Sequence, residues 1–142
     1  MFLGRFNHNL DVKGRLAVPA RFRSDLAAGM VLTRGIDRCL TLYPLAGWEV
    51  LAEKVRALPI TDANARAFRR MVFAEAVDLE LDAQGRILVP PELRAYAGLE
   101  RAAVVVGVDA CIEIWSPEGW VEMSARMDQE GVEIAQTLAD VL

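Results

Sequence analysis

The sequence has little of the chemistry on which enzymes and metal centres depend. It contains a single histidine, His8, and only two cysteines among its 142 residues. It has no glycine-rich phosphate loop, no His/Cys cluster at metal-ligand spacing and no nucleophile–base pair of recognisable spacing. A histidine without such partners is typical of an ordinary strand or turn residue. We therefore expect no catalytic residue, no metal site, no cofactor and no small-molecule substrate.

The sequence also lacks signals for export or membrane insertion. The two cysteines, Cys39 and Cys111, are too few for a disulfide framework, and we expect both to be buried strand residues. No apolar run approaches the ~20 residues that a membrane-spanning helix needs. The N-terminal MFLGRFNHNL has no long apolar segment, so no signal peptide is expected. These features favour a cytoplasmic protein with no membrane partner.

An internal repeat is the strongest feature that the sequence contains. Residues 10–19 read LDVKGRLAVP and residues 81–90 read LDAQGRILVP, with identical Leu, Asp, Gly, Arg, Val and Pro at matched places. The similarity resumes between GIDRCLTLYPLAGW (35–48) and GVDACIEIWSPEGW (107–120). Units this small seldom bury enough surface to fold alone. We therefore expect two copies of one module that share a core in a pseudo-twofold arrangement.

The pattern of hydrophobic and turn-forming residues predicts an α+β fold. Each copy is expected to run strand, turn, strand, short helix, two strands and a helix. The strands are predicted at 5–9, 16–18, 30–33 and 40–43, and again at 77–81, 87–89, 103–106 and 112–115. Asp62 is expected to cap a linker helix, and Ser116 a helix that carries Trp120, Met123 and Met127. Beyond Asp128 the pattern weakens and predicts either a turn or two of amphipathic helix or a loose tail.

Charge is distributed unevenly along the chain. The formal net charge is −4, which argues against a generally basic nucleic-acid binder. However, residues 1–26 carry five basic side chains against two acidic ones, whereas residues 113–142 carry seven acidic against one basic. The high hydrophobic content, 54%, also suggests subunit interfaces and hence an oligomer. If the protein binds nucleic acid, we expect its basic N-terminal end to make the contact. The acidic C-terminal part is then expected to lie away from the phosphates.

These residues resemble the MraZ family of bacterial transcription regulators. The resemblance rests on Gly4-Arg5-Phe6, on the two D-x-x-G-R motifs that each lead to Val-Pro, and on the Gly-Trp pairs at 47–48 and 119–120. It implies two AbrB-type swapped-hairpin β modules packed as an intramolecular pseudo-dimer with flanking helices. It also implies ring-like homo-oligomers in the cytoplasm, associated with the nucleoid, and double-stranded promoter DNA as partner. The corresponding division is a first repeat at 5–51, linker helices at 52–76, a second repeat at 77–123 and an acidic tail at 124–142.

The D-x-x-G-R turns are the candidate DNA-binding elements. In each turn an aspartate and an arginine four residues apart can form a charge-assisted pair. Either the pair only stabilises the turn, or the arginine also contacts DNA. The family resemblance favours DNA contact. Roles in shaping the turn are expected for Asp11, Gly14, Asp82 and Gly85. DNA contact is expected from Arg15 and Arg86, with Lys13 auxiliary and with Arg5, Arg21 and Arg23 as weaker candidates.

The two copies are not equally basic. Lys13 of the first copy corresponds to Gln84 in the second, and Arg21 corresponds to Glu92. Residues 78–101 carry five acidic side chains against three basic ones. We therefore expect the first turn to supply most of the positive surface.

The alternative function is a protein-interaction module. AbrB-type folds also form the DNA-binding half of antitoxins, whose tails fold on a toxin, so the chain could be antitoxin-like or a scaffold with little DNA binding. The mixed aliphatic and acidic residues after Asp128 could bind such a partner or dock on a neighbouring subunit. The exposed cations expected in the first turn distinguish the two hypotheses, because a pure scaffold has no need of them.

Overall fold

Six strands form one antiparallel sheet around which the chain is organised. The computed structural model describes all of residues 1–142. The first half contains strands β1 (Phe2–Asn9), β2 (Arg15–Ala17), β3 (Met30–Arg34) and β4 (Leu40–Pro44) and helices α1 (Leu45–Arg56) and α2 (Ala63–Phe73). The second half contains β5 (Val77–Leu79), β6 (Arg86–Leu88), α3 (Pro91–Ala97), β7 (Ala102–Asp109), β8 (Ile112–Trp115) and α4 (Pro117–Thr137). This composition confirms the predicted α+β class.

The strand order joins the two copies throughout the sheet. The large sheet runs β1-β7-β8-β4-β3-β5, and β2 and β6 form a separate two-stranded ribbon. The first strand of each copy thus pairs with a strand of the other copy: β1 lies on β7, and β5 lies on β3. Neither half can complete its sheet without the other. The two copies therefore form one intramolecular pseudo-dimer.

A pseudo-twofold axis passes through the middle of both sheets. Thr41 on β4 lies opposite Glu113 on β8, and Leu16 on β2 lies opposite Ile87 on β6. Both pairs join equivalent positions of the two copies. The Leu16 and Ile87 side chains are each 1% exposed and belong to one core cluster of 19 buried residues drawn from both halves. The shared core explains how two modules too small to fold alone become stable together.

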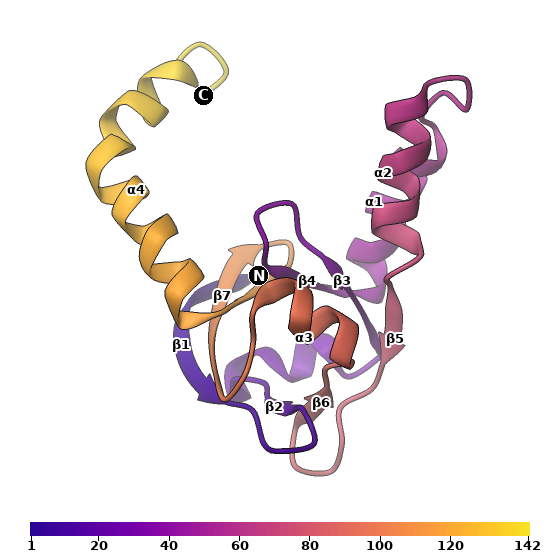
Figure 1. The fold of residues 1–142 in the computed structure, drawn as a ribbon, viewed down its shortest axis with the longest axis vertical. Helices are drawn as coiled ribbons and strands as arrows, with labels where there is room; N and C mark the ends of the chain where they lie inside the picture. The colour runs from indigo at the N-terminus through magenta and orange to yellow at the C-terminus, as the bar shows by residue number, and fades with distance from the viewer.

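Helices α1, α2 and α4 extend from one end of the body, α3 lies within it, and the two D-x-x-G-R turns lie at the other end (Figure 1). Helices α1 and α2 form a hairpin on one side, and α4 projects on the opposite side. The side chain of Asp62 caps α2 by accepting from Asn64 N at 2.8 Å, as its position in the sequence predicts. Thr33 Oγ1 donates to Val72 O at 2.7 Å and ties α2 to the sheet.

Three local expectations need correction. The short helix expected around Phe22 and Leu26 is two successive 3₁₀ turns, Ala20–Phe22 and Ser24–Leu26, although both apolar side chains are buried as expected. Cys39 and Cys111 lie just before β4 and β8 rather than within them, and Cys111 is only half-buried. Burial raises the pKa of Cys39 to about 12 and that of Cys111 to about 11, so both thiols are protonated near neutral pH.

The region after Asp128 is helical and continues α4 without a break to Thr137. It is neither a loose tail nor a separate turn. Ser116 Oγ accepts from Gly119 N at 3.0 Å and caps the helix as predicted, with Pro117 at its first position. No residue of α4 is fully buried. A helix of 21 residues therefore stands on the body mainly through its first turns, where Trp120 and Met123 pack on a small second core cluster.

Candidate nucleic-acid interface

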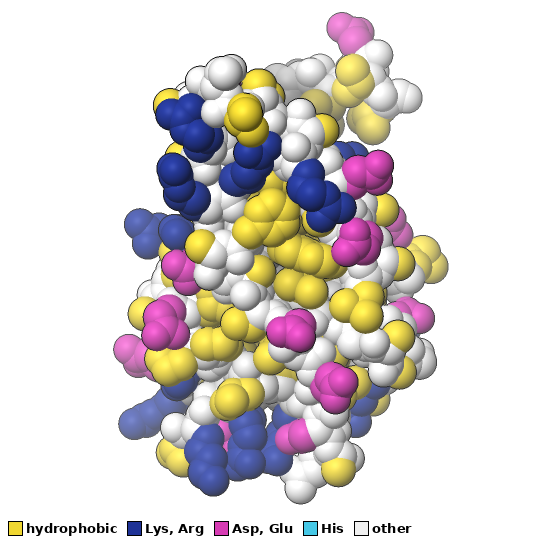
Figure 2. All heavy atoms as spheres, turned by 90° about the vertical axis from the view of Figure 1, so that its right-hand side faces the viewer, with side chains coloured by type: hydrophobic (Ala, Val, Ile, Leu, Met, Phe, Trp, Pro, Cys, Tyr) yellow, Lys and Arg dark blue, Asp and Glu magenta, His cyan; other side chains and the backbone are white.

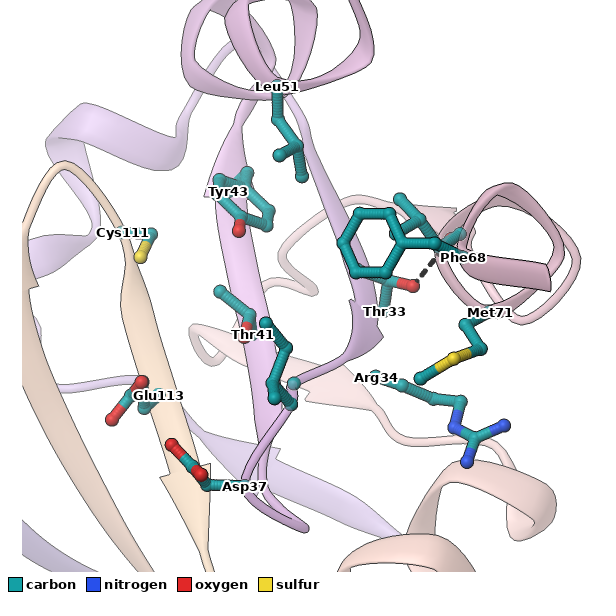
Figure 3. A pocket seen from close by; sticks show the side chains of 13 residues that line it. Thr33, Arg34, Asp37, Thr41, Tyr43, Leu51, Phe68, Met71, Cys111 and Glu113 are labelled. Carbon is teal, nitrogen blue, oxygen red and sulfur yellow. Dashed lines mark hydrogen bonds between the residues drawn. The ribbon is translucent and has the colours of Figure 1, made fainter. Parts of the chain in front are cut away.

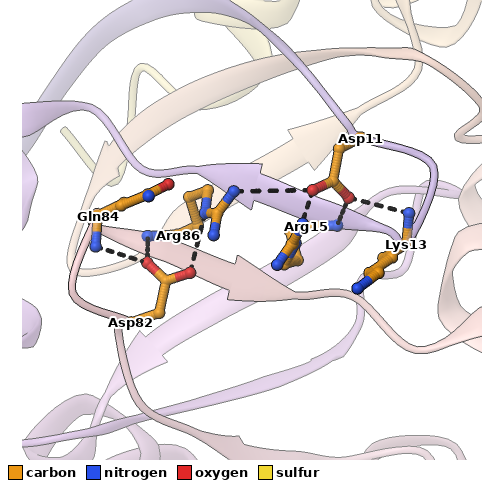
Figure 4. A network of polar contacts seen from close by, with 6 residues as sticks. All are labelled: Asp11, Lys13, Arg15, Asp82, Gln84 and Arg86. Atoms are coloured by element: carbon orange, nitrogen blue, oxygen red, sulfur yellow. Dashed lines mark hydrogen bonds and ion pairs between the residues drawn. The ribbon is translucent and has the colours of Figure 1, made fainter.

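Each D-x-x-G-R segment folds into the same aspartate-centred turn (Figure 4). In the first, Asp11 Oδ1 accepts from the backbone N–H groups of Lys13 at 3.0 Å and Arg15 at 2.9 Å. In the second, Asp82 Oδ1 accepts from those of Gln84 at 2.9 Å and Arg86 at 2.8 Å. A short acceptor that reaches its own downstream backbone is the usual reason for aspartate in a turn. The repeat in sequence is thus a repeat in local structure.

The second oxygen of each carboxylate holds the arginine. Arg15 Nε donates to Asp11 Oδ2 at 2.6 Å, and Arg86 Nε donates to Asp82 Oδ2 at 2.9 Å. Arg86 Nη1 also lies 3.7 Å from Asp11 Oδ2, so the two turns share one charge network. The pKa of Asp11 is lowered mainly by the hydrogen bond from the backbone N–H of Arg15. The pKa of Asp82 is lowered in the same way by the backbone N–H of Arg86. Both carboxylates are therefore ionised near neutral pH and fix the direction of their arginines.

Backbone pairing locks the two turns together. The ribbon of β2 and β6 places Leu16 against Ile87 between the turns. Val18 N donates to Gly85 O, and Val89 N donates to Gly14 O, both at 2.9 Å. Each turn glycine therefore accepts a hydrogen bond from the chain that follows the other turn. The two turns form a single rigid tip rather than two independent loops.

Two further arginines cover the turn glycines from the opposite copy. Arg23 Nε donates to Val18 O at 2.9 Å, and the Arg23 guanidinium lies over Gly85. In the same way, Arg94 Nε donates to Val89 O at 3.0 Å, and the Arg94 guanidinium lies over Gly14. Arg23 was among the DNA-contact candidates; this position gives it a structural role, and its contact with DNA stays a prediction. Arg94 was not among the candidates. It occupies the position in the second copy that Arg23 occupies in the first, and this equivalence could have identified it.

The remaining candidate cations differ in how accessible they are. Lys13 is exposed, and its ammonium group has no acidic partner. Arg21 is exposed near the Phe6 ring, with its guanidinium carbon 6.0 Å from the ring centroid. Arg5 lies on β1 at the same distance, 6.0 Å, from the Trp120 ring. Lys13 and Arg15 are therefore adjacent at the tip, whereas Arg5 lies at the base of α4 and is not brought together with them.

Arg15 and Arg86 are not equally presented. The Arg15 side chain is 35% exposed and no protein acceptor occupies its terminal nitrogens. The Arg86 side chain is 25% exposed, and one of its terminal nitrogens faces Asp11. Seen from the side of α1 and α2, lysine and arginine side chains gather at both ends of the molecule, with acidic side chains across the middle (Figure 2). The turn end is one of these two basic ends.

His8 lies on β1 opposite Ala103. No group of three or more His, Cys, Asp and Glu side chains is placed to hold a metal ion. None of the helices combines the length and the apolar character needed to cross a membrane.

Comparisons with known proteins agree with the repeat. The family model described as "MraZ protein, putative antitoxin-like" matches twice, over residues 1–71 and 72–141. A relative named Transcriptional regulator MraZ from Thermomicrobium roseum is 64% identical over 142 residues, covering 100% of both chains. Relatives of the same name from Herpetosiphon aurantiacus and Moorella thermoacetica are 52% and 46% identical and cover 96% and 99% of this chain and 95% and 98% of their own. With both halves matched by the family model and full-length relatives well above 30% identity, the chain belongs to the MraZ family.

Proposed function

We propose that this protein is a DNA-binding transcriptional regulator, not an enzyme, that acts in the cytoplasm as a homo-oligomeric ring on promoter DNA, including the DNA upstream of its own gene. Full-length relatives carry the name Transcriptional regulator MraZ. The observation that carries the proposal is the rigid double tip. It presents Arg15 and Lys13 at one end of the body, while the acidic helix α4 extends from the other end.

The geometry of the tip suits contact with nucleic acid. Asp11 holds Arg15 through Nε and leaves its two terminal nitrogens free, which is the pair of donors that reads a guanine edge or grips a phosphate. Because the carboxylate fixes the side chain in advance, less side-chain entropy is lost when DNA binds. The exposed Lys13, one residue before Gly14, is proposed to contact a phosphate. Arg86 is proposed as the weaker equivalent, since Asp11 shares one of its terminal nitrogens.

Repetition compensates for the small number of cations on one tip. Several tips on a ring could engage successive segments of one DNA molecule, so that tethering raises the overall affinity without any new contact. The logarithm of affinity falls with the logarithm of salt concentration in proportion to the number of phosphates neutralised. We therefore expect a salt slope steeper than one tip could give. A slope near about −2, or no dependence on salt, would contradict cooperation between tips.

The direct test is binding to the DNA upstream of the protein's own gene, measured by fluorescence anisotropy over a salt series. We expect Arg15→Ala to weaken binding by ~10-fold or more, since one good bidentate contact contributes about 1–3 kcal/mol and recurs on every tip. Arg86→Ala should have a smaller effect. Arg126→Ala is the matched control, because Arg126 lies on α4 and pairs only with Glu130. Folding and oligomer mass are measured for every variant.

The outcomes separate contact from architecture. If both Arg15→Ala and Arg86→Ala bind like the wild type while staying assembled, the arginines only staple their turns and the assigned site is wrong. If the wild type ignores its own upstream DNA and random duplex alike, the interaction-module alternative takes precedence. Nucleic acid that co-purifies with the protein, and that a high-salt wash removes, is an independent sign of DNA binding.

A further inference from the structure

The solvent-facing side of the β2–β6 ribbon carries an apolar side chain beside one of its arginines. Leu16 and Ile87 are buried in the core, so the alternate residues of both strands face outward. Arg15 of β2 lies opposite Leu88 of β6, whose side chain is 53% exposed. Residues opposite each other in an antiparallel pair have Cβ atoms about 4.5–5.5 Å apart. Leu88 is therefore an immediate outward-facing neighbour of Arg15.

The turn that precedes Arg15 adds a second exposed aliphatic side chain. Val12 lies between Asp11 and Lys13 and is 100% exposed, so it contributes nothing to the core. The backbone around it is fixed by the hydrogen bonds of the turn, and a β-branched side chain is stiff. A contact made by Val12 therefore costs little conformational entropy. The turn itself does not require valine, because the second turn has Ala83 at this place.

Both of the equivalent positions around Arg86 are alanine. Across the ribbon Arg86 lies opposite Ala17, and in its own turn Ala83 stands where the first turn has Val12. Isolated exposed apolar residues are common on protein surfaces and need no explanation. Here the two exposed aliphatic residues come from different copies and flank the more exposed of the two arginines. The tip is therefore apolar on one side of its pseudo-twofold axis only.

Apolar side chains at the other end of the body have a different setting. At the α1–α2 hairpin, Leu51 and Phe68 are partly buried and line a cavity of about 220 Å³ between the hairpin and the sheet (Figure 3). At the tip, by contrast, Val12 is fully exposed and Leu88 is more than half exposed. These two side chains are therefore open to contact with whatever the tip binds.

We propose that Val12 and Leu88 recognise thymine in the major groove, by apolar contact with its C5-methyl group beside the base that Arg15 contacts. This inference rests on the proposed DNA binding and names the base chemistry that the tip reads. A two-stranded β-ribbon fits the major groove, where thymine alone among the four bases presents a methyl group. Successive bases lie about 3.4 Å apart along a strand, so the Cβ separation of Arg15 and Leu88 spans one or two base pairs.

The test measures the binding of the full-length protein to two duplexes that differ only in their thymine methyl groups. One is the DNA upstream of the protein's own gene, and the other has deoxyuridine in place of every thymidine. The variant is Val12→Ala/Leu88→Ala, which installs the alanines that the repeat already has at the equivalent positions. Val141→Ala is the matched control, because Val141 is 80% exposed and lies beyond the end of α4. Affinities are measured by fluorescence anisotropy at one salt concentration, and oligomer mass and unfolding midpoint are measured for every protein.

We expect the wild type and Val141→Ala to bind the thymine duplex ~10-fold more tightly than the deoxyuridine duplex, or better. Burial of one methyl group corresponds to roughly threefold to fivefold in affinity, and the contact is made by two side chains. The double variant should bind both duplexes about as the wild type binds the deoxyuridine duplex. The proposal is overturned if the double variant keeps the wild-type preference for thymine. It is also overturned if the variant binds both duplexes equally more weakly than the wild type, because the two residues then support only backbone contacts.

A random duplex distinguishes failure of this inference from failure of the proposed function. If the wild type binds neither its own upstream DNA nor the random duplex, the proposed function is wrong and the inference falls with it. If the wild type prefers its upstream DNA to the random duplex but does not distinguish thymine from deoxyuridine, DNA binding stands and only the methyl contact is wrong.

Single replacements in the DNA then test the predicted spacing. We expect methyl sensitivity at a thymine within about two base pairs of a guanine that Arg15 contacts. That guanine is identified by replacement with 7-deazaguanine, which lacks the N7 acceptor and should weaken the wild type but not Arg15→Ala. Methyl sensitivity spread evenly along the duplex would indicate an effect of DNA shape and would overturn the contact.

Discussion

At the scale of single residues, the tip depends on two glycines that have no room for a side chain. Gly14 and Gly85 adopt φ values of +85° and +75°, which L-amino acids with side chains rarely adopt. A Cβ on Gly14 would lie 2.8 Å from the guanidinium carbon of Arg94, and a Cβ on Gly85 would clash with Arg23. Each glycine therefore satisfies a turn in its own copy and a packing contact with the other copy.

Substitution of either glycine should be costly. We expect Gly14→Ala to lower the free energy of unfolding by about 1–3 kcal/mol, from the strained φ and the displacement of Arg94. Gly131→Ala is the control, since a Cβ there meets nothing within 4 Å and alanine favours the helix. Urea unfolding of the three proteins makes the comparison. Equal stability of Gly14→Ala and the wild type would mean that the turn relaxes easily.

The aspartates make the tip sensitive to acid. The pKa of Asp11 and of Asp82 is lowered from the ordinary value of 3.8, mainly by hydrogen bonds from the backbone N–H groups of Arg15 and Arg86. The unfolded chain therefore binds protons more readily, and the stabilisation is fully present above pH 3.8. It should be lost as the pH falls from 3.8 through the lowered folded-state pKa values. Asp11→Asn/Asp82→Asn should show a shallower fall in unfolding midpoint over that interval than the wild type.

The sequence predicts the hydrogen bonds within each turn but not the arginine that packs over its glycine. An aspartate, a glycine and an arginine at fixed spacing specify local hydrogen bonds, and those bonds are present. The contacts of Arg23 with Gly85 and of Arg94 with Gly14 join residues of different copies. No local pattern encodes such contacts, because they arise only when the two copies pack.

At the scale of elements, α4 differs from the other helices in its source of stability. Helices α1 and α2 each bury two residues, whereas α4 buries none, so capping and propensity contribute a larger share to α4. This also explains why the sequence pattern weakens after Asp128. Beyond its first turns α4 packs on nothing in its own chain, so that part needs no strong apolar periodicity toward a core, and periodicity is the main signal of a helix.

Removal of the α4 cap should therefore be measurable as a loss of helix. Ser116→Ala deletes the acceptor for Gly119 N, an interaction of about 1 kcal/mol at a helix N-terminus. We expect a less negative ellipticity at 222 nm, because the first turns of α4 fray, and a lower unfolding midpoint of the protein. Ser116→Asp should keep most of both, because its carboxylate can accept the same hydrogen bond. If Ser116→Ala and the wild type have identical spectra, tertiary packing rather than the cap holds the helix start.

At the scale of the whole molecule, the halves depend on each other through their strands. β1 pairs with β7 and β5 pairs with β3, so either half alone lacks a partner strand at an edge of its sheet. Period-two patterns identify strands but not their partners, so the sequence did not specify these pairings. The repeat did supply the pseudo-twofold relation, since equivalent residues can lie opposite each other only near such an axis.

Separation of the halves should make folding depend on concentration. We expect 1–71 and 72–142 to be unfolded as isolated monomers and to form a folded complex when mixed. The measurement is circular dichroism and gel filtration of each fragment and of the mixture, with the intact chain as the control. A folded monomeric fragment would show that one copy can complete its own core.

The pairing of the first strand also sets a schedule for the newly made chain. Asn9 pairs with Ala102 and Phe2 pairs with Asp109, so the first strand to leave the ribosome pairs with one of the last. At synthesis rates of ~5–20 residues per second, the partner emerges roughly 5 to 20 s later. During that interval β1, which carries the apolar Phe2 and Phe6, has an unsatisfied backbone and is open to chaperones and to other nascent chains. Neighbouring ribosomes on one messenger RNA hold unpaired β1 segments close together. The delay before β7 emerges therefore limits the rate at which the protein can be made without aggregation of its nascent chains.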